Sequence, residues 1–444
     1  MSPNDDQPYG DVRGLVEARL GRPPQDRLEA AVVLEAWGGV RPPHGLEIAG
    51  AAVDAAHGRP ARSVANPGAS QPRDPAIVAE GLALLVAIVA VALWTRPFGR
   101  ALGTTVWDDA VRLALPITLG GQWLLRSRYL ERPGGLAILR RDGIRIVCLL
   151  GAGCAAATQG ESVLFAVLLT VTWVGGAVLI RRGWGLLYVT LLVAVAIDVN
   201  LGGDPRGALA AAAAATLLLA IVIVATAGAT TEAPGRPRRA AAAGLIGAGI
   251  GGLLVLDTSV GWGAEGVLPA LALVPSTAGS FWGGYHLWRF YDVVPRALAG
   301  VPVEEADRAT WRSPALAVLG GALGRLVGAT LVLSALALLA ATHVAEPQTA
   351  AAAGRIALLG GFGLVALATL LLSLQHSLGF SSWTLFTLAC ALVAEAAVTQ
   401  LDAPPFAGIA LVTGAAVAVA LAIPPVIGLF LRPGRVLATI LWIS

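Results

Sequence analysis

A succession of long apolar runs constrains this chain more than any other feature. Stretches such as 206–228 and 404–432 hold more than twenty mostly apolar residues, the length that a helix needs to cross the hydrocarbon core of a bilayer. Only 13% of the residues are charged, about half the share of a soluble globular domain. The sequence therefore predicts an all-α, polytopic membrane protein.

Proline, glycine and charge clusters divide the apolar region into about twelve transmembrane segments. Six of them fall in a first bundle, 77–232, and six in a second bundle, 233–444. We expect them near 77–94, 108–127, 144–158, 162–180, 184–200, 206–228, 240–256, 265–288, 314–341, 355–376, 380–400 and 404–432.

The N-terminal region has a different pattern. Val12, Leu15, Val16 and Leu20 share one helical face, which predicts a short amphipathic helix. Residues 1–57 are therefore predicted to be a cytoplasmic helical module, available to a protein partner through 11–57, with a poorly ordered tail as the alternative. The following stretch 58–76 is rich in proline, arginine and serine and is predicted to be a linker.

Arginine supplies all 31 basic residues, and its distribution predicts the orientation. Connections after even-numbered segments are rich in arginine, whereas the connections ATQGES, DTSVGWGAEG and LDAPP are not. Because positive loops stay in the cytoplasm, both termini are predicted to be cytoplasmic. The arginine, alanine and glycine bias suggests a GC-rich bacterial genome, so we expect a multi-pass protein of the bacterial plasma membrane.

The two bundles carry related sequences. The second and eighth segments hold the same four residue types at a constant separation of 159 positions: Pro116, Thr118, Gly120 and Trp123, and then Pro275, Thr277, Gly279 and Trp282. A repeat of six segments leaves both halves in the same orientation, and such parallel repeats enclose the substrate path in transporters. The pattern therefore favours a transporter.

The start of the membrane region also resembles a known family. The residues that carry this resemblance are Arg100, Leu102, Gly103, Trp107, Gly120, Gly121 and Arg126. The region is similar to the polysaccharide (Wzx-like) flippase branch of the multidrug/oligosaccharidyl-lipid/polysaccharide (MOP) exporter superfamily. The resemblance implies a V-shaped pair of six-helix bundles, alternating access, and movement of a polyprenyl-diphosphate-linked saccharide from the inner to the outer leaflet.

Three other functions stay open. A major-facilitator-type exporter of small solutes is also built as six plus six segments, but the stretch 140–145 has its arginines and aspartate in another order than that family. A polytopic glycosyltransferase would use external carboxylates such as Asp108 and Asp109. A non-transporting membrane scaffold would present the N-terminal module. The predicted external loops are too short to form a substrate domain, so we do not expect an enzyme. The sequence holds no Walker A loop, GxGxxG–helix unit, HExxH or GxSxG motif, so ATP-driven transport is not indicated either.

Polar residues within apolar segments are candidates for function, because they are costly in lipid. Arg325, deep in the ninth segment, is predicted to bind substrate or to pair with a helix-terminal carbonyl or a carboxylate. Arg112 is predicted to bind substrate or, by its spacing, to form an ion pair with Asp108. Glu395 is a candidate for ion coupling or for pairing with an arginine. Arginine binds phosphate through several planar contacts, while aromatic and amide groups suit sugars. The other predicted substrate-binding residues are Arg126, Arg128, Arg289, Gln122, Trp123, Trp282, Tyr285 and His286.

The remaining polar residues carry weaker predictions. Cys148, Cys154 and Cys390 lack metal-ligand spacing, so no metal, disulfide framework or cofactor is expected. Gln375 and His376 fall at a predicted cytoplasmic turn and are expected to face water. A net charge of +3 does not favour nucleic acid, so the expected partners are membrane lipid and the lipid-linked substrate.

Overall fold

The protein is described here by a computed structural model. The described residues are 12–20, 24, 27–37, 48–49, 74–130, 135–142, 160–226, 237–262, 267–288, 308–344, 349–377, 379–401 and 408–431. Within these ranges the regular secondary structure is helical. The two short N-terminal helices are α1 (Val12–Leu20) and α2 (Arg27–Trp37).

Eleven long helices follow among the described residues. They are α4 (Asp74–Leu102), α5 (Thr104–Leu125), α7 (Glu161–Arg181), α8 (Gly185–Asn200), α9 (Pro205–Ala225), α10 (Pro237–Val255), α11 (Val267–Trp288), α13 (Arg308–Val344), α14 (Thr349–Ser377), α15 (Ser381–Thr399) and α16 (Ile409–Leu431). A π-helical turn, η1 (Arg126–Leu130), continues α5.

The membrane class of the protein is confirmed. Eight helices among the described residues are long and apolar enough to cross a membrane, and α8 is a shorter apolar helix. Eleven of the predicted segments coincide with long helices, and 144–158 lies outside the described residues. The layout of twelve spans in two repeats stays a prediction.

The chain divides into two compact units. One holds 1–73, 284–323 and 423–444, and the other holds 74–283 and 324–422. In the first unit, α1 and α2 surround a small apolar core that includes Val16, Val33 and Leu34, each at most 1% exposed. Leu15 and Leu20 of α1 pack against this core, so the predicted amphipathic face of α1 is the buried one.

In the second unit, α5 and α10 lie against each other along much of their length. Glycines on α10 permit this close approach. A Cβ atom on Gly247 would stand 2.4 Å from the Leu119 carbonyl oxygen, and one on Gly251 would stand 2.5 Å from the Pro116 Cα. Both obstacles are backbone atoms of α5, so larger residues at these positions would push the two helices apart.

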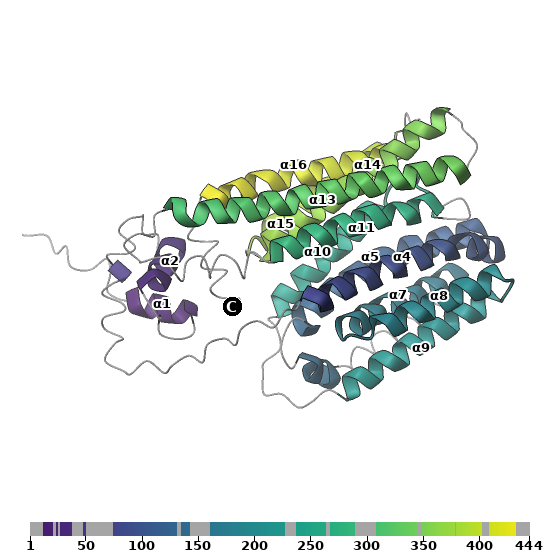
Figure 1. Cartoon of the computed structure of the whole chain (residues 1–444), viewed down its shortest axis with the longest axis horizontal. Helices are drawn as coiled ribbons and strands as arrows, with labels where there is room; N and C mark the ends of the chain where they lie inside the picture. Colours follow the sequence, from purple (N-terminus) through teal and green to yellow (C-terminus); the bar gives the residue numbers. More distant parts are fainter. Residues whose placement is uncertain are drawn as a thin grey trace, which may run out of the picture. The chain divides into compact units, whose positions relative to one another are not determined.

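Several helix contacts in this unit come in pairs. In each pair, the helices of one contact lie six predicted segments further along the chain than the helices of the other, as a six-helix repeat would require. Helix α4 runs beside α8 (Figure 1), and α10 runs beside α15. Helix α5 contacts α7 through Gln122, and α11 contacts α14 through the Ser280 hydroxyl, which donates to the Ala366 carbonyl. The third pair joins helices of the two predicted bundles. Helix α5 contacts α10, and α11 contacts α4 through Phe281, which lies against Gly81.

Candidate functional site

Two carboxylates are buried together where α10 ends near α15. Glu395 of α15 is 0% exposed and Asp257, just after α10, is 2% exposed. The Asp257 backbone N–H donates to Glu395 Oε1 at 3.2 Å. Glu395 Oε2 is also buried and has no hydrogen-bond partner among the described residues. Burying an unpaired charge is expensive, so this oxygen is suited to carrying a proton.

The Asp257 carboxylate has a structural explanation of its own. Its Oδ1 accepts the Ser259 backbone N–H at 2.9 Å and the Ser259 hydroxyl, and its Oδ2 accepts the Leu411 N–H at 3.2 Å. The Ser259 hydroxyl in turn accepts the Gly408 N–H at 3.0 Å. Because the first N–H groups of a helix lack intrahelical partners, Asp257 and Ser259 cap the start of α16.

Glycine makes room for the Glu395 side chain. A Cβ atom on Gly414 of α16 would stand 2.8 Å from both the Cβ and the Oε2 of Glu395. The stripe of α15 that includes Glu395 also buries Thr384, Thr387 and Ala391, the spacing of one helix face. Helix α15 therefore turns its most polar face inward.

A second cluster joins α5 to the segment after α10. Arg112 Nε lies 2.5 Å from Asp108 Oδ2, so the ion pair predicted from the spacing is confirmed. The other Asp108 oxygen accepts the Trp262 N–H. The guanidinium of Arg112 donates to the carbonyls of Val255, Asp257, Thr258 and Val260. Arg112 thus closes the C-terminal end of α10, where a cation is favoured.

Two arginines at the other end of α5 lie in η1. Arg126 is exposed, while Arg128 forms a 3.6 Å ion pair with Asp142. Arg128 also stacks over the Tyr129 ring at 5.4 Å. Burial raises the pKa of Tyr129, and donation of its hydroxyl to Asp142 Oδ2 at 2.9 Å raises the pKa further. The phenol therefore stays a donor at neutral pH.

Gln122 and Trp123 face different helices. The Gln122 side-chain amide donates to the Trp173 carbonyl of α7 at 3.0 Å. Trp123 lies against α10, where a Cβ atom on Gly247 would stand 2.8 Å from the indole ring. The structure therefore separates these two predicted sugar contacts, although they are neighbours in the sequence.

The other predicted residues lie on α11 and α13 or outside the described part. Arg325 is exposed on α13, on the stripe that includes Val332 and Leu336, which are 61% and 55% exposed. Trp282 of α11 is 43% exposed, and Tyr285 is half-buried. The His286 side chain and all of Arg289 lie outside the described residues.

The structure corrects one prediction and adds two residues. Gln375 and His376 are 0% and 8% exposed, so the expectation that they face water is wrong. Asp257 and Ser259 were not among the predicted site residues, because they seemed only part of a short external connection. The sequence signal was a carboxylate directly after the apolar segment 240–256.

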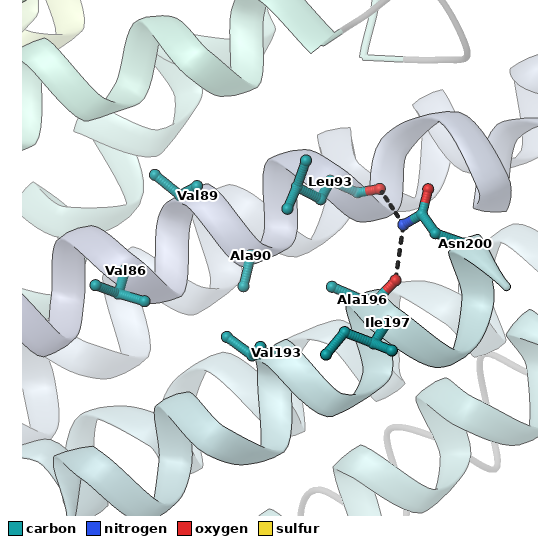
Figure 2. Close-up of a pocket in the computed structure, with 8 residues that line it drawn as sticks. All are labelled: Val86, Val89, Ala90, Leu93, Val193, Ala196, Ile197 and Asn200. Atoms are coloured by element: carbon teal, nitrogen blue, oxygen red, sulfur yellow. Dashed lines mark hydrogen bonds between the residues drawn. The ribbon is translucent and has the colours of Figure 1, made fainter.

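An apolar groove lies between α4 and α8. It has a volume of about 290 Å³ and is lined by residues that include Val86, Val89 and Val193 (Figure 2). Asn200 closes one end, where its side-chain amide donates to the carbonyls of Ala196 at 2.7 Å and Leu93 at 3.3 Å (Figure 2). Among its described residues, the second unit thus contains an apolar groove and, apart from it, a buried carboxylate pair.

Comparison with known proteins gives a distant likeness. No protein-family model and no curated protein matches the chain. A solved multidrug resistance MATE transporter of the MOP superfamily, in its outward-facing conformation, is 16% identical, with a TM-score of 0.43 over 82% of this chain and 96% of that chain. A MATE structure in complex with MaL6 is 15% identical, with a TM-score of 0.39 over the same shares. These likenesses are weak, and the chain's own residues carry its proposed function.

Proposed function

We propose that the protein is an alternating-access transporter in which Glu395 couples movement of the substrate to movement of a proton. The buried, half-satisfied carboxylate of Glu395 carries this proposal. Ionisable residues inside membrane helices are costly and serve in relays and ion pathways. Asp257 is held by capping contacts, whereas Glu395 Oε2 has no such contact among the described residues.

The paired helix contacts support a two-repeat mechanism. Contacts of α4 with α8 and of α10 with α15 are the ones that two parallel six-helix repeats would relate, and transporters of that design move one repeat against the other. Arg112 joins the start of α5 to the end of α10 at one membrane face. Opening the protein at that face would have to break these hydrogen bonds.

The substrate that we propose is a polyprenyl-diphosphate-linked saccharide, moved from the inner to the outer leaflet. Arg126 and Arg128 stand at the end of α5 that the arginine pattern places in the cytoplasm, and Arg325 is an exposed cation within a membrane helix. A diphosphate needs such fixed positive groups, because lipid does not solvate its charge. The guanidinium of each arginine can bind phosphate oxygens through several contacts.

Reconstitution in proteoliposomes tests the substrate. A fluorescent lipid-linked oligosaccharide is placed in the vesicles, and its appearance in the outer leaflet is followed with a membrane-impermeant quencher. The wild type should move it, Arg325→Ala should abolish the movement, and Arg325→Lys should retain part of it. Arg181→Ala, which removes a 3.0 Å surface pair with Glu80, is the matched control and should leave the rate unchanged.

The same vesicles separate the other functions. Efflux of a soluble solute without movement of the lipid would favour a small-solute exporter. Release or transfer of the sugar would favour a glycosyltransferase. Neither activity in a folded protein would favour a scaffold, and an Arg325→Ala rate equal to that of the wild type would remove Arg325 from the substrate path.

A further inference from the structure

The exposed face of α4 changes its chemistry along the helix. Exposed residues recur there every three or four positions, the spacing of one helix face. From one end to the other they include Leu82, Val86, Val89, Leu93, Arg96 and Arg100. All of them lie in a stretch that is long and apolar enough to cross a membrane. Helix α4 therefore presents one continuous stripe that is apolar first and cationic at its C-terminal end.

The apolar part of this stripe forms one wall of the groove between α4 and α8 (Figure 2). The floor of the groove is made by Ala90 and Ala196, which are 2% and 4% exposed. Its walls are larger side chains such as Val86, Leu93 and Ile197, which are between 43% and 56% exposed. A hydrocarbon chain that lies in such a groove contacts protein atoms on several sides and gains dispersion energy from each contact.

The groove ends at a polar closure just before the two arginines. Pro97 lies inside α4 and has no N–H, so the Leu93 carbonyl lacks its usual helical donor. The Asn200 amide supplies a donor to this carbonyl at 3.3 Å. Val86 and Arg96 are ten residues apart, which is about 15 Å along a helix and half of a hydrocarbon core roughly 30 Å thick. The groove and its cationic end thus match the depth of one leaflet.

Arg96 and Arg100 differ from other arginines of the same unit in their contacts. Neither forms a hydrogen bond or an ion pair within the part of the chain that the structure describes. Arg112, Arg181 and Arg206, by contrast, each pair with a carboxylate. The predicted orientation also places this end of α4 at the external face, where arginine is not favoured by topology. The two guanidinium groups are therefore available to an anion from outside the chain.

We propose that the groove between α4 and α8 binds an acyl chain of an anionic phospholipid, whose phosphate contacts Arg96 and Arg100. Arginine binds phosphate oxygens through parallel, charge-assisted hydrogen bonds. A zwitterionic phospholipid binds more weakly, because its ammonium group is repelled by the same arginines. The site lies on the helices of one predicted bundle, and the inference does not depend on the transported substrate or on the role of Glu395.

Photocrosslinking with two lipid probes tests the proposal. The full chain is reconstituted in phosphatidylcholine vesicles that contain phosphatidylglycerol with a diazirine on one acyl chain, and the labelled residues are mapped by mass spectrometry. Label should be several-fold denser on 86–93 and 193–197 than on the exposed apolar face of α9, which includes Leu218 and Val222. A phosphatidylcholine probe with the same diazirine should label the groove less.

Variants separate the contributions of the arginines and the groove. Replacing Arg96 and Arg100 together with glutamine should lower phosphatidylglycerol labelling of the groove to the level of the phosphatidylcholine probe. Val89→Trp, which fills the groove from an exposed wall position, should lower labelling by both probes. Arg206→Gln removes another exposed arginine, and Leu218→Trp adds a ring on α9; neither should change the labelling of the groove.

Two results in the wild type would overturn the proposal, whether or not the variants fold. Equal phosphatidylglycerol labelling of the groove and of the α9 face would identify the groove as a place for ordinary boundary lipid. Equal labelling of the groove by the two probes would show that Arg96 and Arg100 do not select an anionic headgroup.

Discussion

The last turns of α8 and α15 hold different kinds of polar side chain, although each helix packs against the first long helix of its predicted bundle, α4 and α10 respectively. In α8, Asn200 is exposed, and its amide donates to two backbone carbonyls. In α15, Glu395 is fully buried and keeps one oxygen without a partner among the described residues. A neutral amide with satisfied donors stabilises local structure, whereas a buried carboxylate with a spare oxygen is suited to a proton.

The residues near Asn200 and near Glu395 also differ in polarity. Near the end of α4, Trp94, Phe98 and Trp107 are at most 1% exposed and form an aromatic cluster, with the Trp94 indole donating to the Leu192 carbonyl. The end of α10 is more polar, because Asp257 and Ser259 follow it. We infer that the aromatic cluster at the end of α4 serves packing, whereas the end of α10 lies beside the ionisable Glu395.

The largest effect on stability is expected from Asp257→Ala. This change leaves the Ser259 N–H, the Ser259 hydroxyl and the Leu411 N–H without their acceptor, and the free energy of unfolding should fall by roughly 3 kcal/mol or more. Asn200→Ala, which removes the exposed amide at the end of α8, should cost about 1 kcal/mol or less. Thermal unfolding in detergent ranks the two, and a larger loss for Asn200→Ala would contradict the comparison.

The sequence predicted the helices better than it predicted the contact between Asp257 and Glu395. Helix α7 was expected over 162–180 and spans Glu161–Arg181, because hydrophobicity and length alone define a membrane helix. Asp257 and Glu395 are separated by 138 positions, and no local pattern reports such a contact. Glu395 was singled out because it interrupts an apolar run, while Asp257 seemed to belong to a loop.

Helix ends and buried polar residues were also hard to predict. Helix α13 spans Arg308–Val344, longer than the expected 314–341, because backbone hydrogen bonding continues past the point where the apolar run ends. Gln375 and His376 looked like turn residues, yet they pack inside the helix bundle. The partner of Gln375 is a carbonyl near two prolines on another helix, a relation that the sequence alone does not reveal.

The next effect is expected where α5 contacts the end of α10. Arg112→Ala removes the donors to four carbonyls at the end of α10, and we expect a loss of about 2 kcal/mol in the free energy of unfolding. Arg206→Ala breaks a 3.0 Å pair with Glu161 in which both side chains are 56% exposed, and should cost less than about 1 kcal/mol. Equal melting temperatures for the two variants would show that the Arg112 contacts stabilise the protein no more than an exposed ion pair does.

A smaller effect on stability is expected at two helix contacts that the predicted repeat would relate, α10 against α5 and α4 against α11. Gly251→Ala places its Cβ against the α5 backbone, and should destabilise by about 1–3 kcal/mol. Gly81→Ala places its Cβ 2.2 Å from the end of the Phe281 ring, which can turn away, so its cost should be lower. Phe281→Leu should restore the stability of Gly81→Ala, while no side-chain change is expected to restore Gly251→Ala. Thermal unfolding of the single and double variants in detergent measures the loss of stability. A greater loss for Gly81→Ala than for Gly251→Ala would contradict this ranking.

The most direct test of the central claim is the response of transport to an imposed proton gradient. Proteoliposomes that contain the wild type, Glu395→Gln or Asn200→Ala are given a pH difference, and movement of the fluorescent lipid-linked oligosaccharide is compared with and without it. The gradient should accelerate the wild type and Asn200→Ala, whereas Glu395→Gln, which is neutral at every pH, should not respond. If the gradient accelerates Glu395→Gln as much as the wild type, Glu395 is not the coupling group.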